Sequence, residues 1–191
     1  MRALILKEIR GFFSSLIGYV VVLAFLLMVG LFLWVFPGPW NVMSVGIASM
    51  DPFFTLAPWV MIFLVPAITM RMFAEERRSG TLELLLTRPL LEWQIVLAKF
   101  IGALALIAMS LLPTFAFVWV IGELGSPVWN IDLGGVWGSY VGLFMLASSM
   151  AAIGLFVSSM TRQPLIAFLA SMLLSTLCFI GFTALGNFSI L

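Results

Sequence analysis

The chain has 191 residues, of which 63% are hydrophobic and only 9% are charged. Soluble domains carry about 25% charged residues, so this composition excludes a soluble globular protein and indicates a polytopic helical membrane protein. The apolar runs are continuous and do not alternate with polar residues, which excludes a transmembrane β-barrel.

Residues 1–15 mix charged and apolar positions ahead of the first long apolar run. This pattern is typical of a helix that lies in the membrane interface and then turns into a spanning helix. A plain positively charged flank is the alternative. The apolar run that follows is too long for the core of a signal peptide and offers no cleavage site, so we interpret it as a retained first span.

Five apolar stretches are long enough to cross a hydrocarbon core of ~30 Å at 1.5 Å per residue. They cover residues 16–36, 53–70, 100–121, 136–159 and 165–185. The sequence therefore predicts an all-α fold, a polytopic transmembrane bundle of five spans within a single domain, 1–191.

The basic residues alternate sharply between the segments that connect these spans. The N-terminus and the second and fourth connections hold all nine: Arg2, Lys7, Arg10, Arg71, Arg77, Arg78, Arg88, Lys99 and Arg162. The first and third connections hold only acidic charges: Asp51, Glu123 and Asp132. Because cytoplasmic segments carry the excess of Lys and Arg, we expect a cytoplasmic N-terminus.

The fourth span begins with glycines at every fourth position, Gly134, Gly138 and Gly142. Small residues at this spacing let two helices approach closely. We expect these glycines to pack against another helix of the same monomer, with a contact to a second subunit as the alternative.

The spans lack the groups that membrane catalysis and ion coupling need. No span carries an ionisable residue near its centre, which argues against proton relays and ion sites. The sequence has no histidine, a single cysteine, Cys178, and no Walker A motif. We therefore expect a non-catalytic membrane subunit without a cofactor or a metal, and any energy must come from a partner. No basic patch suits nucleic acid, so we expect no nucleic-acid partner.

The longest inner segment, 71–92, is the part best suited to meet a cytoplasmic partner. We expect the second span to continue through Arg78 and to be broken at Gly80. A short helix over 81–87 would then place leucines on one face, and Pro89 would stand in the first turn of the next helix. A solvated loop whose charges only orient the spans is the alternative.

The sequence of this segment, EERRSGTLELLLTRPL from Glu75 onward and then WQIV and KF, resembles the signature of ABC-2-type transporter permeases. Further stretches, at 7–8, 12–15, 18–19, 32–36, 57–59, 66–71, 130–134 and 138–140, are similar to the gliding-motility-associated (GldF-type) permease subunits of that family. Together these stretches extend the resemblance over all 191 residues.

The resemblance implies that segment 71–92 docks on an ATPase and couples its action to transport. It assigns this role to Arg71, Glu75, Glu76, Gly80, Thr81, Glu83, Thr87 and Pro89. It also implies an ABC ATP-binding subunit, a second permease subunit in a homo- or heterodimer, the lipid bilayer, and a multi-pass place in a bacterial inner membrane.

The number of spans, an alternative function and the nature of the cargo complete these expectations. The family has six spans per permease and this sequence shows five, which predicts that the sequence is truncated at its C-terminus. The alternative function is an ATP-independent structural or assembly subunit of a motility or secretion complex. Spans without charged residues suit an apolar or lipid-like cargo, although a polar cargo at a subunit interface is equally compatible.

Overall fold

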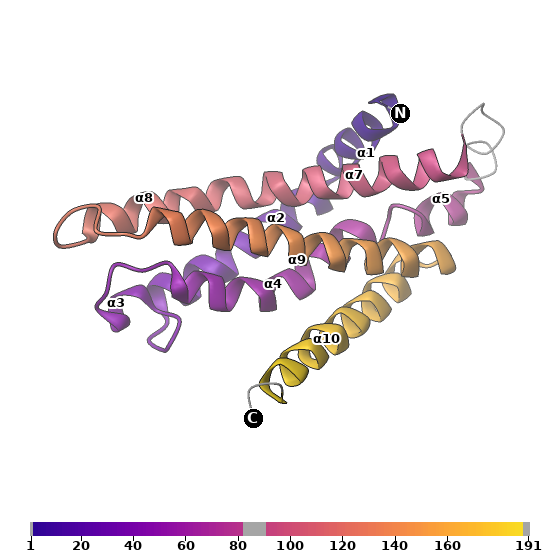
Figure 1. Ribbon diagram of the computed structural model, residues 1–191. Coiled ribbons are helices and arrows are strands. Elements are labelled where there is room, and N and C mark those ends of the chain that lie inside the picture. The colour runs from indigo at the N-terminus through magenta and orange to yellow at the C-terminus, as the bar shows by residue number, and fades with distance from the viewer. Residues whose placement is uncertain (1, 82–90, 189–191) are drawn as a thin grey trace.

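The computed structural model describes residues 2–81 and 91–188, and this part of the chain forms helices without any strand (Figure 1). Five helical stretches are long and apolar enough to cross a membrane. They run over Leu16–Val35, Asp51–Ser79, Glu92–Leu124, Leu133–Met160 and Pro164–Ala184. The predicted all-α class and the predicted number of spans are therefore confirmed.

The helices follow one another with short connections. The elements are α1 (Arg2–Ser14), α2 (Leu16–Gly30), the π-helical turn η1 (Leu31–Val35), α3 (Val42–Val45), α4 (Asp51–Thr69), α5 (Ala74–Ser79), α7 (Glu92–Leu111), the 3₁₀ turn η2 (Leu112–Thr114), α8 (Phe115–Leu124), α9 (Leu133–Met160) and α10 (Pro164–Phe188). A helix thus covers most of the predicted interfacial segment 1–15, while its place in the membrane interface stays a prediction.

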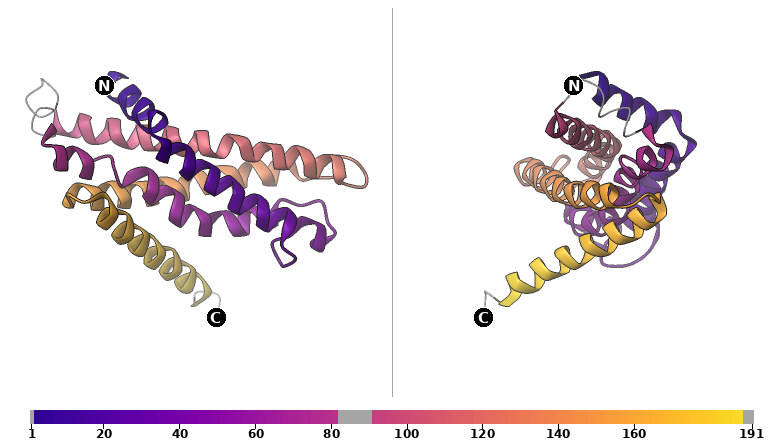
Figure 2. Two further views of the ribbon diagram at one scale, coloured as in Figure 1. Left: turned by 180° about the vertical axis from the view of Figure 1, so that it is seen from behind. Right: turned by 90° about the vertical axis from the view of Figure 1, so that its right-hand side faces the viewer.

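Helix α4 is the centre of the bundle and packs against α2, α7, α9 and α10. Its side chains supply much of the core, with Phe53, Met61 and Val65 fully buried. Helix α10 leaves this bundle at an angle, as two directions of view show (Figures 1 and 2). Only 17% of its spanning window is buried in the chain, so most of its surface is free to contact lipid.

Small residues do bring α9 close to α4, but they are not the predicted ones. Ala147, Ala151, Gly154 and Ser158 are all buried and recur three or four residues apart along α9. A Cβ added to Gly154 would collide with the hydroxyl of Thr69 on α4. The close approach therefore depends on the absence of a side chain at Gly154.

The glycines predicted to pack lie on the exposed side of α9. Gly134, Gly138 and Gly142 are exposed, and a Cβ at Gly138 or Gly142 would meet no described atom within 4 Å. A Cβ at Gly134 would approach only the nearby side chain of Asp132, at 3.3 Å. The prediction of packing within the monomer is therefore wrong for these residues, because the buried face of α9 is a different one. Their contact with a second subunit stays a prediction.

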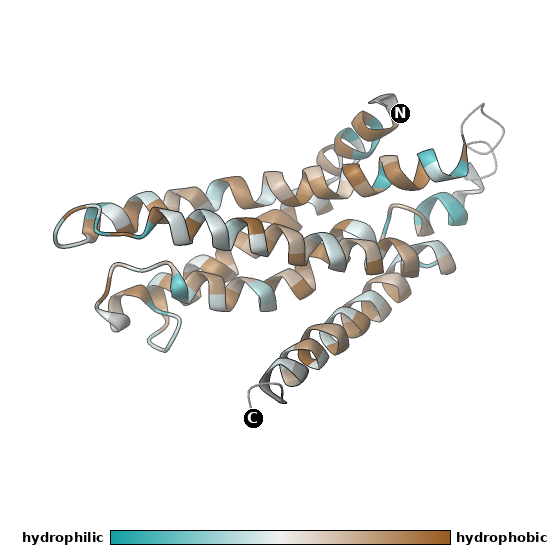
Figure 3. Cartoon of the chain, viewed as in Figure 1, coloured by the Kyte–Doolittle hydropathy of each residue, from teal (hydrophilic) through white to brown (hydrophobic). Residues whose placement is uncertain are grey.

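Polar residues gather at the two ends of the bundle (Figure 3). Helices α1 and α5, the start of α7 and the α9–α10 connection lie at one end (Figure 1). Helix α3, the start of α4 and the end of α8 lie at the other. Arg77 and Arg162 thus belong to the first end and Asp51 to the second, which matches the predicted separation of charges along the membrane normal.

Candidate functional site

The second span is interrupted where it reaches the basic end of the bundle. Helix α4 ends at Thr69, and α5 begins again at Ala74. The hydroxyl of Ser158 on α9 donates to the carbonyl of Met70 (3.0 Å) and accepts from the N–H groups of Phe73 (3.2 Å) and Ala74 (3.1 Å). Backbone groups freed inside a membrane protein need such partners, so Ser158 fixes the turn from which α5 projects.

Lys99 lies inside α7 with its side chain fully buried, next to this turn. Its ammonium group lies 2.9 Å from Glu8 Oε1 on α1 and 2.9 Å from Glu76 Oε2 on α5. It also donates to the backbone carbonyl of Met72 and lies 4.9 Å from the ring centroid of Phe73. One cation therefore contacts α1, α5 and the turn that joins α4 to α5.

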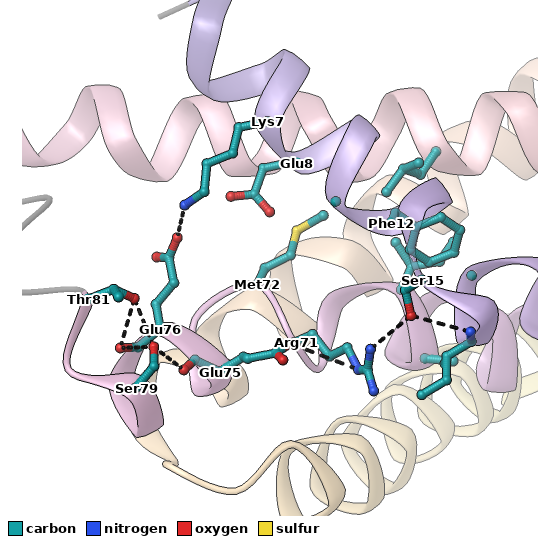
Figure 4. Close-up of a pocket in the computed structure, with 16 residues that line it drawn as sticks. Lys7, Glu8, Phe12, Ser15, Arg71, Met72, Glu75, Glu76, Ser79 and Thr81 are labelled. Carbon is teal, nitrogen blue, oxygen red and sulfur yellow. Dashed lines mark hydrogen bonds and ion pairs between the residues drawn. The ribbon is translucent and has the colours of Figure 1, made fainter.

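Lys7 on α1 completes the arrangement, with its ammonium donating to Glu76 Oε1 at 2.7 Å (Figure 4). We call Lys7, Glu8, Glu76 and Lys99 the ion network. Its two carboxylates balance its two ammonium groups, and a buried charge is tolerated when it is paired in this way. Glu76 Oε2 accepts no aligned hydrogen bond from the described residues, so its contact with Lys99 is an ion pair rather than a directional bond.

A second polar contact, across a groove from the ion network, joins the α4–α5 turn to the start of α2. Arg71 donates from Nη1 to Ser15 Oγ at 3.2 Å, and its Nε lies 4.0 Å from Glu75 Oε2. Ser15 is also the N-cap of α2, where its hydroxyl accepts from the N–H of Ile17. The groove between these contacts has a volume of about 340 Å³ and is lined by α1, the start of α2, the end of α4, and α5 (Figure 4).

The predicted coupling residues differ in how far their side chains are exposed. The side chain of Glu75 is 61% exposed, whereas that of Glu76 is only 12% exposed. The two neighbouring glutamates therefore differ in their surroundings, since Lys7 and Lys99 hold Glu76 inside the ion network.

Gly80 ends α5 as predicted. It adopts the left-handed conformation with φ 71°, which glycine adopts more readily than any other residue. Thr81 follows it, exposed, with its hydroxyl 2.8 Å from that of Ser79. The predicted short helix over 81–87 and the coupling residues Glu83, Thr87 and Pro89 lie outside the described residues.

Sequence reasoning missed four members of this site: Lys7, Glu8, Lys99 and Ser158. Lys99 was assigned to a connecting segment because the apolar run begins only after it, whereas α7 already begins at Glu92. The stretches 7–8 and 99–100 belong to the family resemblance and were the available signal. No group of three His, Cys, Asp or Glu side chains within residues 2–81 and 91–188 could hold a metal ion.

Comparison of the sequence with known protein families identifies one matching family. The model of a family described as "ABC-2 family transporter protein" matches residues 2–190, which is nearly the whole chain. No curated protein and no solved structure matches the chain significantly.

Proposed function

The chain belongs to the ABC-2 transporter family, and from that membership we propose that it is the permease subunit of a transporter in a bacterial inner membrane. In this proposal a separate ABC ATP-binding subunit hydrolyses ATP, and a second permease subunit completes the membrane pore. The ion network is the observation that carries the proposal, because it connects the base of the partner-facing segment 71–92 with α1 and α7.

The proposed coupling follows from how α5 is held. Ser158 fixes the turn at the start of α5, and Lys99 joins α5 to α1 and α7. A force that a partner applies to segment 71–92 would reach the spanning helices α7 and α9, and also α1, through these contacts. Nucleotide-dependent movement of the partner would then favour one of two arrangements of the spans. This requires that the partner binds the two arrangements with different affinity.

The coupling residues divide into two roles in this proposal. Glu75, Gly80 and Thr81 are exposed and form a docking face, to which the resemblance adds Glu83, Thr87 and Pro89. Arg71 and Glu76 position α5, because their side chains bond to α1 and to the start of α2.

Co-expression of this chain with an ABC ATP-binding subunit from the same genome, followed by co-purification, tests the proposal. We expect the ATPase to remain bound, and we expect Glu75→Gln to weaken its retention, since loss of an important interface contact costs about 2 kcal/mol or more. Glu123→Gln is the matched control, because Glu123 is an exposed carboxylate at the opposite end of the bundle.

The opposite outcome favours the alternative function. If both variants insert normally, retain the ATPase and leave its activity unchanged, segment 71–92 is not a docking element. If no ATPase co-purifies at all, an ATP-independent structural or assembly role explains the chain better.

The narrower similarity to gliding-motility-associated permeases gives the proposal a cellular setting. We propose that transport by this chain supports surface movement of the cell. Deletion of its gene in a gliding host is expected to abolish colony spreading, and the Glu75→Gln gene is expected to restore less spreading than the wild-type gene. Normal spreading of the deletion strain would remove this part of the proposal only.

A further inference from the structure

Four arginines line one open pocket on the side of α5 next to the α9–α10 connection. The pocket has a volume of about 660 Å³, and its lining is Met70, Arg71, Arg77, Arg78, Arg162, Gln163, Pro164 and Leu165. These arginines are four of the nine basic residues in the sequence. No acidic side chain is among the described residues that line it.

The charge of this arginine pocket is not neutralised by the part of the chain that the structure describes. Arg77, Arg78 and Arg162 are exposed and form no ion pair with a residue in 2–81 or 91–188. With the described residues Arg71 forms one ion pair, the 4.0 Å contact with Glu75. Arginines that converge without counter-charges repel one another, so the arrangement is suited to an anion supplied from outside the chain.

The start of α10 adds to the positive character of the pocket. This helix has 25 residues and begins at Pro164, so its N-terminal end opens at the pocket wall. Helix N-termini carry partial positive charge and unpaired N–H groups, which favour phosphate. Arginine adds a planar fork of donors that matches the oxygens of a phosphate.

An apolar surface leads away from the pocket along α10. Leu165 lines the pocket, and Leu169, Leu173 and Leu177 follow it at every fourth position. Their exposed fractions are 69%, 56%, 60% and 60% in that order. We call these four residues the leucine stripe. A soluble anion would contact only the arginines, whereas a phospholipid would use both surfaces.

We propose that the arginine pocket binds the phosphate-bearing headgroup of an anionic phospholipid, with an acyl chain against the leucine stripe. Basic pockets between helices at the end of a membrane bundle are suited to such headgroups. The proposal does not depend on the proposed ATPase coupling, because no residue of the ion network lines the arginine pocket.

Competition for a fluorescent phosphatidylglycerol, measured by anisotropy with the purified full chain in a neutral detergent, tests this proposal. We expect unlabelled phosphatidylglycerol to displace the probe and phosphatidylcholine to displace it poorly. Arg162→Gln is expected to weaken binding roughly five-fold, and Arg78→Gln/Arg162→Gln roughly 25-fold, as each basic residue near an anionic surface contributes about that factor.

Arg10→Gln is the matched control, because it removes one exposed arginine from α1, at the same end of the bundle, without touching the pocket. Equal weakening by Arg10→Gln and Arg162→Gln would overturn the proposal in favour of a general charge effect. Displacement by inorganic phosphate or glycerol phosphate as effective as that by the lipid would also overturn it, since the site would then bind a soluble anion. If Arg162→Gln does not yield monodisperse protein, these competition measurements on the wild-type chain still decide between lipid and soluble anion.

Discussion

Replacing Lys99 with methionine tests the ion network most directly. Methionine preserves the length and the apolar part of the side chain but removes the charge that contacts Glu8 and Glu76. Glu76 keeps Lys7 as a partner in the variant, whereas Glu8 keeps no cation among the described residues. We therefore expect most of the cost to come from the carboxylate of Glu8, which stays largely buried.

The magnitude follows from the burial. Lys99 is fully buried and Glu8 only 12% exposed, so solvent screens the pair little. Removing one partner of a buried ion pair costs about 3–5 kcal/mol. For a chain of this size 1 kcal/mol corresponds to about 2–4 °C in Tm, so Lys99→Met should lower Tm by about 6–20 °C.

Thermal unfolding in detergent, followed by the fluorescence of the seven tryptophans, measures this shift. Glu8→Gln in the Lys99→Met background should recover part of the loss, because it removes the unpaired carboxylate. The resulting double-mutant cycle should give a coupling energy of about 1–3 kcal/mol between the two residues. Lys7→Met is the control, since Lys7 is 57% exposed and its pair should contribute less than about 1 kcal/mol.

Two results would refute this reasoning. Unfolding of Lys99→Met at the wild-type temperature would show that the charge is not held in a buried network. An equal effect of Glu8→Gln with and without Lys99 would show that the two side chains do not interact.

Three further substitutions test the elements around the network. Gly154→Leu should prevent the close approach of α9 to α4 and cost at least about 2 kcal/mol of stability. Gly138→Leu, on the exposed face, should leave the thermal stability of the monomer unchanged. Equal effects of the two substitutions would contradict the packing of α9 on α4 at Gly154. Ser158→Ala should lower stability by about 1–3 kcal/mol, because it leaves two N–H groups and one carbonyl without their partner, and unchanged thermal unfolding would exclude this role. Gly80→Val should place a β-branched residue at φ 71° and reduce ATPase retention while membrane levels stay normal. Gly80→Asn should retain the ATPase better, because asparagine tolerates that conformation. Equal retention by the two variants would show that the bend at Gly80 is not required.

The number of spans could be predicted from the sequence because it depends on length and hydropathy alone. The end of α5 could be predicted too, because a glycine is the residue that most readily adopts the left-handed conformation found at Gly80. Both features are local and need no knowledge of neighbouring helices.

The contacts of the site depend on which helix faces meet, and hydropathy does not determine these faces. Span four offers two sets of small residues, and the set with the more regular spacing, around Gly138, proved to be exposed. The set that includes Gly154 is buried because it faces α4. The role of Lys99 was hidden for a similar reason, because its two carboxylates come from positions 8 and 76, far away in the sequence.

Helix α5 has only six residues, and a helix this short has little stability of its own in water. Its position must therefore come from its contacts, which differ on its two sides. Glu76 binds it to α1 and α7 through the ion network, while Arg77 and Arg78 line the arginine pocket beside α10. An anion in that pocket would neutralise charge on one side of α5 without entering the network on the other. The same short helix would thus connect segment 71–92 both to the spans and to the surrounding lipid.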